Sequence, residues 1–353
     1  METPKHPRCA TALCDGQARH VQSGSRPSAG RGRATAGEVV VIGGPTASGK
    51  SGLALDLARV LDGVVINADS MQVYRELSVL TARPGPADMA HAPHRLYGVL
   101  SGEERCSVAR WRAMSLAEID AAHGAGKLPI VVGGTGLYLR ALMAGLADIP
   151  EIPEPIRAAT GELFEALGGA AFHDELRRRD PKAATRLPPG DRQRLVRAFE
   201  VMAATGRSIV DWQNEPAAAS QGLSFHAIAL MPEREPLYAA CNARFLAMMD
   251  SGALDEVRDL AHAELDPSLP VMKALGVPEL LGHLAGNLML DEAVAAAQQA
   301  TRRYAKRQLT WFRHQWPGAG VDLLSSQVLP AQYSGSGIHD ILAGIGRGEG
   351  DGS

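Results

Sequence analysis

The chain has 353 residues, of which 45% are hydrophobic and 21% are charged, and its formal net charge is −3. This is the balance of an ordinary soluble protein with a sizeable core. No apolar run is long enough to span a membrane, and the small net charge gives no indication of a nucleic-acid partner. The four cysteines show no paired metal-ligand spacing, which indicates free thiols and a cytoplasmic location.

Residues 1–37 are expected to be a disordered tail, because they are rich in Gly, Pro, Ser and Arg and show no apolar periodicity. They contain no hydrophobic core of a secretory signal. Two alternatives stay open. An upstream start codon, wrongly chosen, would give such a segment, and so would a mitochondrial transit peptide, which is rich in arginine and poor in acids.

Strands and helices alternate over residues 38–146, which is typical of a parallel α/β sheet. Short runs rich in β-branched residues predict strands at Val39–Ile42, Val64–Ile66, His94–Leu100 and Leu128–Val132. Apolar residues at helical spacing predict helices at Ser51–Leu61, Val108–Ala122 and Leu137–Met143.

Residues 147–222 interrupt this alternation. Several prolines mark the entrance, helices such as Arg192–Thr205 follow, and a strand returns at Phe225–Met231. The simplest organisation is an all-helical subdomain at 147–222, inserted between the two parts of an α/β core at 38–146 and 223–330.

The rest of the chain is predicted to be mostly helical. The expected elements are helices at Glu235–Met249, Leu254–His262, Val271–Leu284 and Glu292–Gln315, and a last strand at Val321–Leu324. Residues 331–353 contain many glycines and are expected to form a flexible tail.

Residues 44–51 read Gly-Pro-Thr-Ala-Ser-Gly-Lys-Ser and fit the phosphate-binding pattern G-x-x-x-x-G-K-[ST], between a predicted strand and a predicted helix. Backbone N–H groups of such a loop point inward, Lys50 reaches bridging oxygens, and Ser51 can hold Mg²⁺. The residues that line the site are Gly44, Pro45, Thr46, Ala47, Ser48, Gly49, Lys50 and Ser51. The pattern does not identify the phosphate, and it fits a small-molecule P-loop kinase equally well.

Two further segments follow predicted strands. Asp69 comes directly after the second strand, so it is expected near the phosphate loop, because ligands of open α/β sheets bind beyond the carboxyl ends of the strands. A helix cap is the equally simple alternative for this aspartate. Gly133-Gly134-Thr135-Gly136 ends a later strand and indicates either close approach of a ligand or a tight strand-to-helix turn.

Five motifs in order resemble those of the tRNA dimethylallyltransferase family, also called isopentenyl-diphosphate:tRNA transferases. They are GPTASGKS at the phosphate loop, ADSMQVYR at Ala68–Arg75, VVGGTGLYLRAL at Val131–Leu142, DRQRLVRAFEV at Asp191–Val201 and YAKRQLTWFR at Tyr304–Arg313. The resemblance runs from about Val39 to Leu324. It is of the bacterial type, because no Cys/His cluster of a zinc finger follows.

The resemblance implies a P-loop NTPase-like parallel sheet flanked by helices, and an enzyme that acts as a monomer with Mg²⁺. The donor would be dimethylallyl diphosphate, and the acceptor would be N6 of the adenosine at position 37 in the tRNA anticodon stem-loop. The product would be N6-(dimethylallyl)adenosine, in tRNAs that read codons beginning with U. A kinase, or a non-catalytic RNA-binding protein, remains the alternative from the phosphate loop alone.

The resemblance also implies roles for single residues. Asp69 would accept the proton of N6, Thr46 and Arg234 would assist catalysis at the diphosphate, and Thr135 would hold the flipped base. The positions that match tRNA contacts of the family are Asp69, Ser70, Met71, Gln72, Thr135, Arg157, Gln193, Arg194, Leu195, Val196, Arg197 and Lys273. Cleavage of an allylic carbon–oxygen bond builds charge on the diphosphate, which cations and N–H groups stabilise.

The chain departs from the family pattern at two places. Many relatives have a second arginine six positions after the one that matches Arg234, where this chain has Ala240, so more of the diphosphate contact would fall to Lys50, Arg234 and Arg244. The Gly-Tyr-[Lys/Arg]-Glu motif is replaced by Gly-Val-Pro-Glu at residues 276–279.

A cluster of Arg and Lys on the last long helix, from Arg302 to Arg313, is either a tRNA surface or a solvated face.

Overall fold

The computed structural model describes residues 37–215, 222–317, 321, 323–329, 332–335 and 337–346. Its centre is a six-stranded sheet in the order β3-β2-β4-β1-β5-β6, in which every neighbouring pair is parallel. This confirms the predicted fold class. The strands are β1 (Glu38–Gly43), β2 (Gly63–Asn67), β3 (His94–Arg95), β4 (Leu128–Gly133), β5 (Ser224–Leu230) and β6 (Leu323–Leu329).

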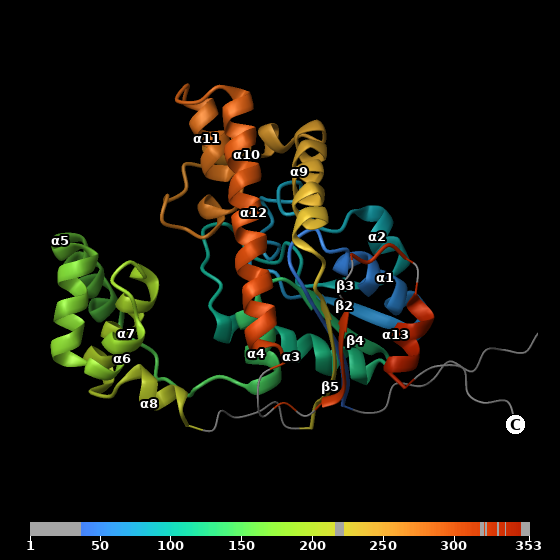
Figure 1. Ribbon diagram of the computed structural model, residues 1–353, viewed down its shortest axis with the longest axis horizontal. Coiled ribbons are helices and arrows are strands. Elements are labelled where there is room, and N and C mark those ends of the chain that lie inside the picture. Colours follow the sequence, from blue (N-terminus) through green and yellow to red (C-terminus); the bar gives the residue numbers. More distant parts are fainter. Residues whose placement is uncertain are drawn as a thin grey trace, which may run out of the picture. The chain divides into compact units, whose positions relative to one another are not determined.

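Helices cover both faces of the sheet (Figure 1). Alternate residues of β1 divide between two hydrophobic clusters, as the period of a strand requires. Val40 and Ile42 pack with α1 (Lys50–Leu61), whereas Val39 and Val41 belong to the cluster that contains Trp111 of α3 (Val108–Gly124) and residues of α4 (Gly136–Ala144). Burial on both faces explains why β1 is a continuous apolar run without polar alternation.

Between α4 and β5 the described residues form helices only. They are α5 (Glu154–Arg179), α6 (Pro181–Arg186), α7 (Arg192–Thr205) and α8 (Ile209–Gln213). These helices contact one another and share a small core of their own, in which Phe172 and Phe199 lie with ring centroids 5.1 Å apart. Gly168 interrupts α5 with a φ of 72°, so this segment is two helices joined at a kink.

The remaining helices follow β5. They are α9 (Arg234–Asp250), α10 (Ala253–His262), the 3₁₀ helix η1 (Val271–Lys273), α11 (Val277–Leu284), α12 (Leu290–Gln315) and α13 (Ile338–Gly344); α2 (Pro86–His91) lies earlier, before β3. The single helix predicted at Val271–Leu284 is wrong. The chain breaks because Gly276 adopts a φ of 93° and Pro278 can occupy only the first turn of a helix.

Three other boundaries differ from the expectation. The strand expected at His94–Leu100 is only two residues long, and a single bridge joins Tyr74 to Leu100 beyond it. The last strand begins at Leu323 and ends at Leu329. In place of a flexible tail over the described part of residues 331–353, α13 buries apolar side chains against α1.

Candidate active site

The carboxyl ends of β1, β2 and β4 deliver the three motifs to one edge of the sheet. β1 ends at Gly43, and the phosphate loop then curls into α1, which begins at Lys50. Ala47 and Gly49 have positive φ values of 62° and 85°, which turns successive peptide groups of the loop. Since this loop opens a helix, its N–H groups and the helix dipole favour an anion.

Lys50 lies inside this loop, where its Nζ donates a hydrogen bond to Pro45 O at 3.1 Å. Burial is the main cause that lowers the pKa of Lys50 from 10.5 to about 8; the nearby charge of Arg244 lowers it further, and Asp69 opposes both. The lysine is therefore an ammonium group at neutral pH, but burial destabilises its charged form as long as no anion is bound.

Asp69 is positioned by Asn67, a fully buried residue at the end of β2. The Asn67 side chain donates to Asp69 O at 3.0 Å and to Leu96 O at 3.0 Å, and it accepts the Asp69 N–H at 2.8 Å. Trp111 Nε1 donates to Asn67 O at 2.8 Å from α3. Sequence analysis missed Asn67; a polar residue that ends a buried strand was the available signal.

The Asp69 carboxylate accepts the Met71 N–H at 2.9 Å and so closes a turn. The residues after it form turns and not a helix, which removes the helix-cap alternative. Thr135 lies beside this turn, because its Oγ1 accepts the Ser70 N–H at 3.0 Å and donates to Ser70 Oγ at 3.3 Å. Gly133 permits this packing, since a Cβ there would collide with the carbonyl of Ala68.

Two cavities meet at this edge. One, of about 370 Å³, is lined by the phosphate loop from Thr46 to Ser51 together with Gln72, Tyr97 and Ala240. The other, of about 240 Å³, is lined by a mixture of apolar and cationic side chains, among them Phe245, Met248, Lys273, Tyr304 and Arg307. The residues common to both are Thr46, Asp69, Thr81 and Arg244. Asp69 therefore borders the cavity of the phosphate loop on one side and the smaller cavity on the other.

Arg244 of α9 occupies the place that was expected for Arg234. Its guanidinium donates to Thr46 Oγ1, in the phosphate loop. Arg234 is the first residue of α9, is exposed, and is not among the residues that line either cavity. The expectation for Arg234 followed the spacing of the motif, whereas in the structure Arg244, further along the same helix, lines the cavities.

Gln308 of α12 joins the phosphate loop to the Gly-Gly turn. Its Oε1 accepts the Thr46 N–H at 2.9 Å, and its Nε2 donates to Gly134 O at 2.9 Å. The side chain is buried, and Ala305, Leu309 and Phe312 form the buried face of the same helix, as expected from their spacing. Sequence analysis missed Gln308, because its two partners lie far away in the chain.

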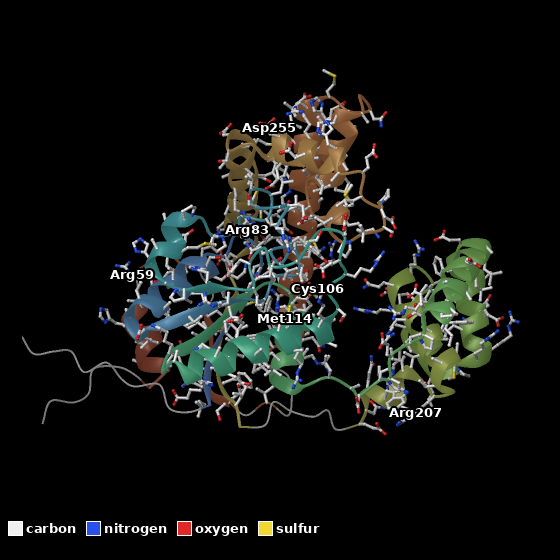
Figure 2. All side chains as sticks on the ribbon, turned by 180° about the vertical axis from the view of Figure 1, so that it is seen from behind. Arg59, Arg83, Cys106, Met114, Arg207 and Asp255 are labelled. Atoms are coloured by element: carbon white, nitrogen blue, oxygen red, sulfur yellow. The ribbon has the colours of Figure 1, made fainter. Side chains whose placement is uncertain are left out.

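The loop that follows Asp69 is also fixed by side chains. Gln72 Nε2 donates to Thr81 O at 2.8 Å and to Ala82 O at 3.0 Å. Arg83, which is labelled in Figure 2, donates to Tyr74 O at 3.1 Å. Ser70 and Met71 line the second cavity and Gln72 lines the first. This brings four of the expected tRNA-contacting positions, Asp69 to Gln72, to the cavity walls.

The expected contacts on α5 and α7 lie on a different surface. Arg194 is exposed and Arg197 is partly buried, and they pair with Asp191 and Glu200, each at 3.5 Å. Gln193 is also exposed, and Val196 is partly buried. Arg157 donates to Ile152 O at 3.0 Å and lies near the carboxylates of Glu151 and Glu154.

Leu195 is a correction. Its side chain is fully buried among the residues of the helical core, so it is not available to a nucleic acid. Residues three or four apart on an amphipathic helix face inward together, and the run Gln193–Arg197 therefore cannot contact tRNA as one continuous surface. Arg207, between α7 and α8, lies over the Trp212 ring at 4.6 Å and pairs with Glu215 at 2.7 Å (Figure 2).

Comparison with known proteins identifies the family. A model described as IPP transferase matches residues 72–315, and one described as isopentenyl transferase matches residues 37–101. The chain belongs to the IPP transferase family. A tRNA dimethylallyltransferase of Rhodospirillum centenum is 62% identical over 278 residues, which are 78% of this chain and 88% of the relative. One of Paramagnetospirillum magneticum is 59% identical over 80% of this chain and 89% of the relative.

Solved structures agree with this assignment. The tRNA isopentenylpyrophosphate transferase of Bacillus halodurans is 32% identical, with a TM-score of 0.62 over 88% of this chain and 96% of its own. A eukaryotic dimethylallyltransferase acting on tRNA is 30% identical, with a TM-score of 0.67 over 78% of this chain and 69% of its own. The chain is thus an enzyme of the prenyl-transfer class, and the comparisons do not favour a small-molecule kinase.

Proposed function

We propose that the protein transfers a dimethylallyl group from dimethylallyl diphosphate to N6 of adenosine 37 in the anticodon stem-loop of tRNA. One observation carries this proposal: Asp69 lies on the wall shared by the phosphate-loop cavity and the second cavity. A carboxylate next to a diphosphate site would repel the ligand, so it needs another task, and accepting a proton from an incoming amine is such a task.

The donor's diphosphate lies in the phosphate loop. Lys50, Arg244 and the loop N–H groups stabilise the negative charge that grows on the leaving diphosphate as the allylic carbon–oxygen bond breaks. Thr46 is held on both sides, by Gln308 at its N–H and by Arg244 at its hydroxyl, so the first turn of the cradle is fixed before the donor binds. Arg234, which is exposed, has at most a peripheral part in this arrangement.

The acceptor base reaches Asp69 through the second cavity. A base must leave its stack to enter such a site, and Tyr304 and Phe245 supply flat apolar surface there. Thr135 fixes the Ser70 backbone next to Asp69, and its side chain lies near the Tyr304 hydroxyl. The N6 amine becomes cationic as it attacks the allylic carbon, and Asp69 takes its proton.

The residues present fit a magnesium ion that is bound together with the donor. Ser51 and Asp69 offer hard oxygen atoms to the same cavity, and Mg²⁺ is often bound by one or two protein oxygens plus substrate phosphates. Within the described residues no group of three or more His, Cys, Asp and Glu could hold a metal alone. When bound, the ion would neutralise charge on the diphosphate.

The helical segment 147–222 is proposed to bind tRNA through Arg157, Arg194 and Arg197, and the enzyme is proposed to act as a monomer in the cytoplasm. None of the helices among the described residues has the length and apolar character of a membrane span.

One experiment tests the proposed function. Purified protein is incubated with an unmodified anticodon stem-loop, Mg²⁺, and either dimethylallyl diphosphate or ATP, and the nucleosides are analysed by mass spectrometry. The expected result is the mass gain of one dimethylallyl group on a single adenosine, without ATP. A product that forms only with ATP would contradict the proposal and restore the kinase.

A further inference from the structure

The segment after β6 lies against the outer side of the phosphate loop. Gln332 Nε2 donates to Ala47 O at 3.0 Å, and Tyr333 N donates to Ser48 O at 3.1 Å. The Tyr333 hydroxyl donates to Asp56 Oδ2 at 2.8 Å, on α1. Both family models end before this segment, the later one at residue 315, so it lies outside the matched region.

These contacts fix the direction of the loop's peptide groups. In a trans peptide the C=O and the N–H of the next residue point to opposite sides of the chain. When Tyr333 binds the carbonyl of Ser48 from outside, the N–H of Gly49 is directed to the cavity side. Gln332 fixes the preceding peptide group, whose Ser48 N–H donates to Pro45 O at 3.3 Å within the loop. Ala47, Ser48 and Gly49 all line the cavity.

The packing is close enough to constrain the sequence. A Cβ at Gly49 would collide with the Tyr333 carbonyl, and the φ of 85° at Gly49 already disfavours other residues. Burial and the hydrogen bond to Asp56 raise the pKa of Tyr333 to about 12, so its hydroxyl stays a donor across the physiological range.

Both ends of the segment are anchored. β6 pairs with β5 in the sheet, and α13 buries Ile341, Leu342 and Ile345 in the same cluster as Leu53 and Leu57 of α1. Figure 1 shows α13 beside α1, and contacts between the two helices agree with this view. The segment is thus held independently of the few polar bonds it makes to the loop.

We infer that Gln332 and Tyr333 are positioning residues of the donor site: they hold the carbonyls of Ala47 and Ser48 outward, which fixes the curl of the loop and directs the Gly49 N–H to the diphosphate. The inference rests on the proposed function, because it assumes that the loop binds the donor's diphosphate. It concerns donor binding and leaves tRNA binding untouched, which separates it from a general contribution to stability.

The test measures binding of inorganic diphosphate by calorimetry and transfer kinetics with dimethylallyl diphosphate. The variants are Gln332→Ala, Tyr333→Phe and a chain that ends at residue 331, with Gln315→Ala as the control because Gln315 is an exposed glutamine at the end of α12. Each lost hydrogen bond is worth about 0.5–1.5 kcal/mol. We therefore expect Gln332→Ala to weaken diphosphate binding and raise KM for the donor about threefold to tenfold, with an unchanged KM for tRNA.

The shortened chain should show a larger loss of the same kind, and Tyr333→Phe a smaller one, because its main-chain bond to Ser48 remains. Wild-type affinity for diphosphate in a folded Gln332→Ala variant would overturn the inference, as would a variant whose only change is a lower melting temperature. If the wild-type protein binds diphosphate but transfers nothing to tRNA, the proposed function fails while the positioning effect is still measured by binding. If the shortened chain does not fold, the two point variants decide.

Discussion

The sheet edge and the helical segment α5–α8 hold their charged side chains in opposite ways. Lys50, Asp69 and Arg244 lie at least partly buried around one cavity and act on each other's charge. On α7 the exposed Arg194 pairs with Asp191, and the partly buried Arg197 pairs with Glu200, in each case three residues away.

This difference indicates what each region can do. Charges in a desolvated site interact strongly and must keep their geometry, which suits chemistry on a fixed substrate. Exposed ion pairs are worth only ~0–1 kcal/mol, so Arg194 can exchange its carboxylate for a tRNA phosphate at little cost. Glu200 has only 12% of its side chain exposed, so Arg197 would leave its partner at a greater cost. Five predictions test this difference, and the first has the largest expected effect.

Two aspartates make the sharpest contrast. Asp69→Asn removes the base while keeping the size, and it should lower the single-turnover rate about 10²–10⁴-fold, because this is the usual contribution of general-base assistance. Diphosphate binding should persist. The melting temperature should change little, since an amide oxygen can still accept the Met71 N–H.

Asp191→Asn is the control in the helical segment. Asp191 caps α7 by accepting the Arg194 N–H at 3.3 Å, and Asn is an equally good cap. It should leave transfer chemistry nearly unchanged. Near-normal single-turnover chemistry in Asp69→Asn would remove Asp69 from the mechanism and end the distinction between the two regions.

A change at Gln308 tests whether the shape of the phosphate loop depends on contacts from α12, which is distant in the chain. Gln308→Ala leaves the Thr46 N–H and the Gly134 carbonyl without their partner, at a cost of about 1–3 kcal/mol for a buried group. Donor KM should rise about tenfold or more, and the loss should exceed that of Gln315→Ala on the same helix. Equal kinetics in the two variants would show that the loop keeps its shape without α12.

Much of the site was predictable because its motifs are local. The phosphate loop, Asp69 and Thr135 each follow a strand, and parallel strands bring such positions to one edge. Gln308 was not predictable, because its acceptor bond to Thr46 spans 262 residues of the chain. The sequence analysis considered Arg244 only as an additional contact of the diphosphate, because the motif pointed to Arg234. A sequence does not show which of two arginines on one helix lies at the cavity.

The fold shows the same limit. Strongly periodic helices such as α7 were predicted to the residue, because one face carries the apolar side chains. α13 was missed, although Ile338, Ile341, Leu342 and Ile345 have helical spacing, because the glycines around them outweighed this short signal. What decides α13 is the apolar surface of α1, which belongs to the other end of the chain.

The arginines of α7 should affect only tRNA. Replacing Arg194 and Arg197 by Ala should weaken binding of the anticodon stem-loop about fivefold to twentyfold, and each lost phosphate contact should flatten the log–log salt dependence by ~0.7–0.9. Diphosphate binding should stay at the wild-type value. Arg177→Ala and Arg178→Ala on α5 are matched controls, because these arginines also pair with acids on their own helix. An unchanged salt slope in the α7 double variant would make its arginines a solvated face.

Lys50 gives the smallest and most specific signal, a proton. Its pKa is lowered to about 8 before the donor binds, and a bound dianion must raise it again. At pH 8 about half of the molecules should therefore take up a proton at Lys50 when inorganic diphosphate binds, whereas at pH 6.5 almost none should, because the lysine is already charged. Calorimetry in two buffers of different ionisation enthalpy measures this uptake, and Lys50→Arg should abolish the Lys50 part of it.

Lys50 should also make the stability of the folded chain and its affinity for diphosphate change in opposite directions as the pH rises. Its pKa is lower in the folded chain than the ordinary value of 10.5, so between pH 8 and 10.5 the unfolded chain binds more protons, and the folded state gains relative stability as the pH rises. Affinity for diphosphate should fall over this interval, because the free enzyme loses the ammonium group that the anion needs. Lys50→Met removes both dependences at once, whereas Lys182→Met, whose exposed ammonium pairs with Asp211 at 2.9 Å in the helical segment, should change neither. If melting temperature and diphosphate affinity changed in the same direction with pH, the lowered pKa of Lys50 would be contradicted. The view that burial destabilises charges at the sheet edge, but not those of the helical segment, would then fail too.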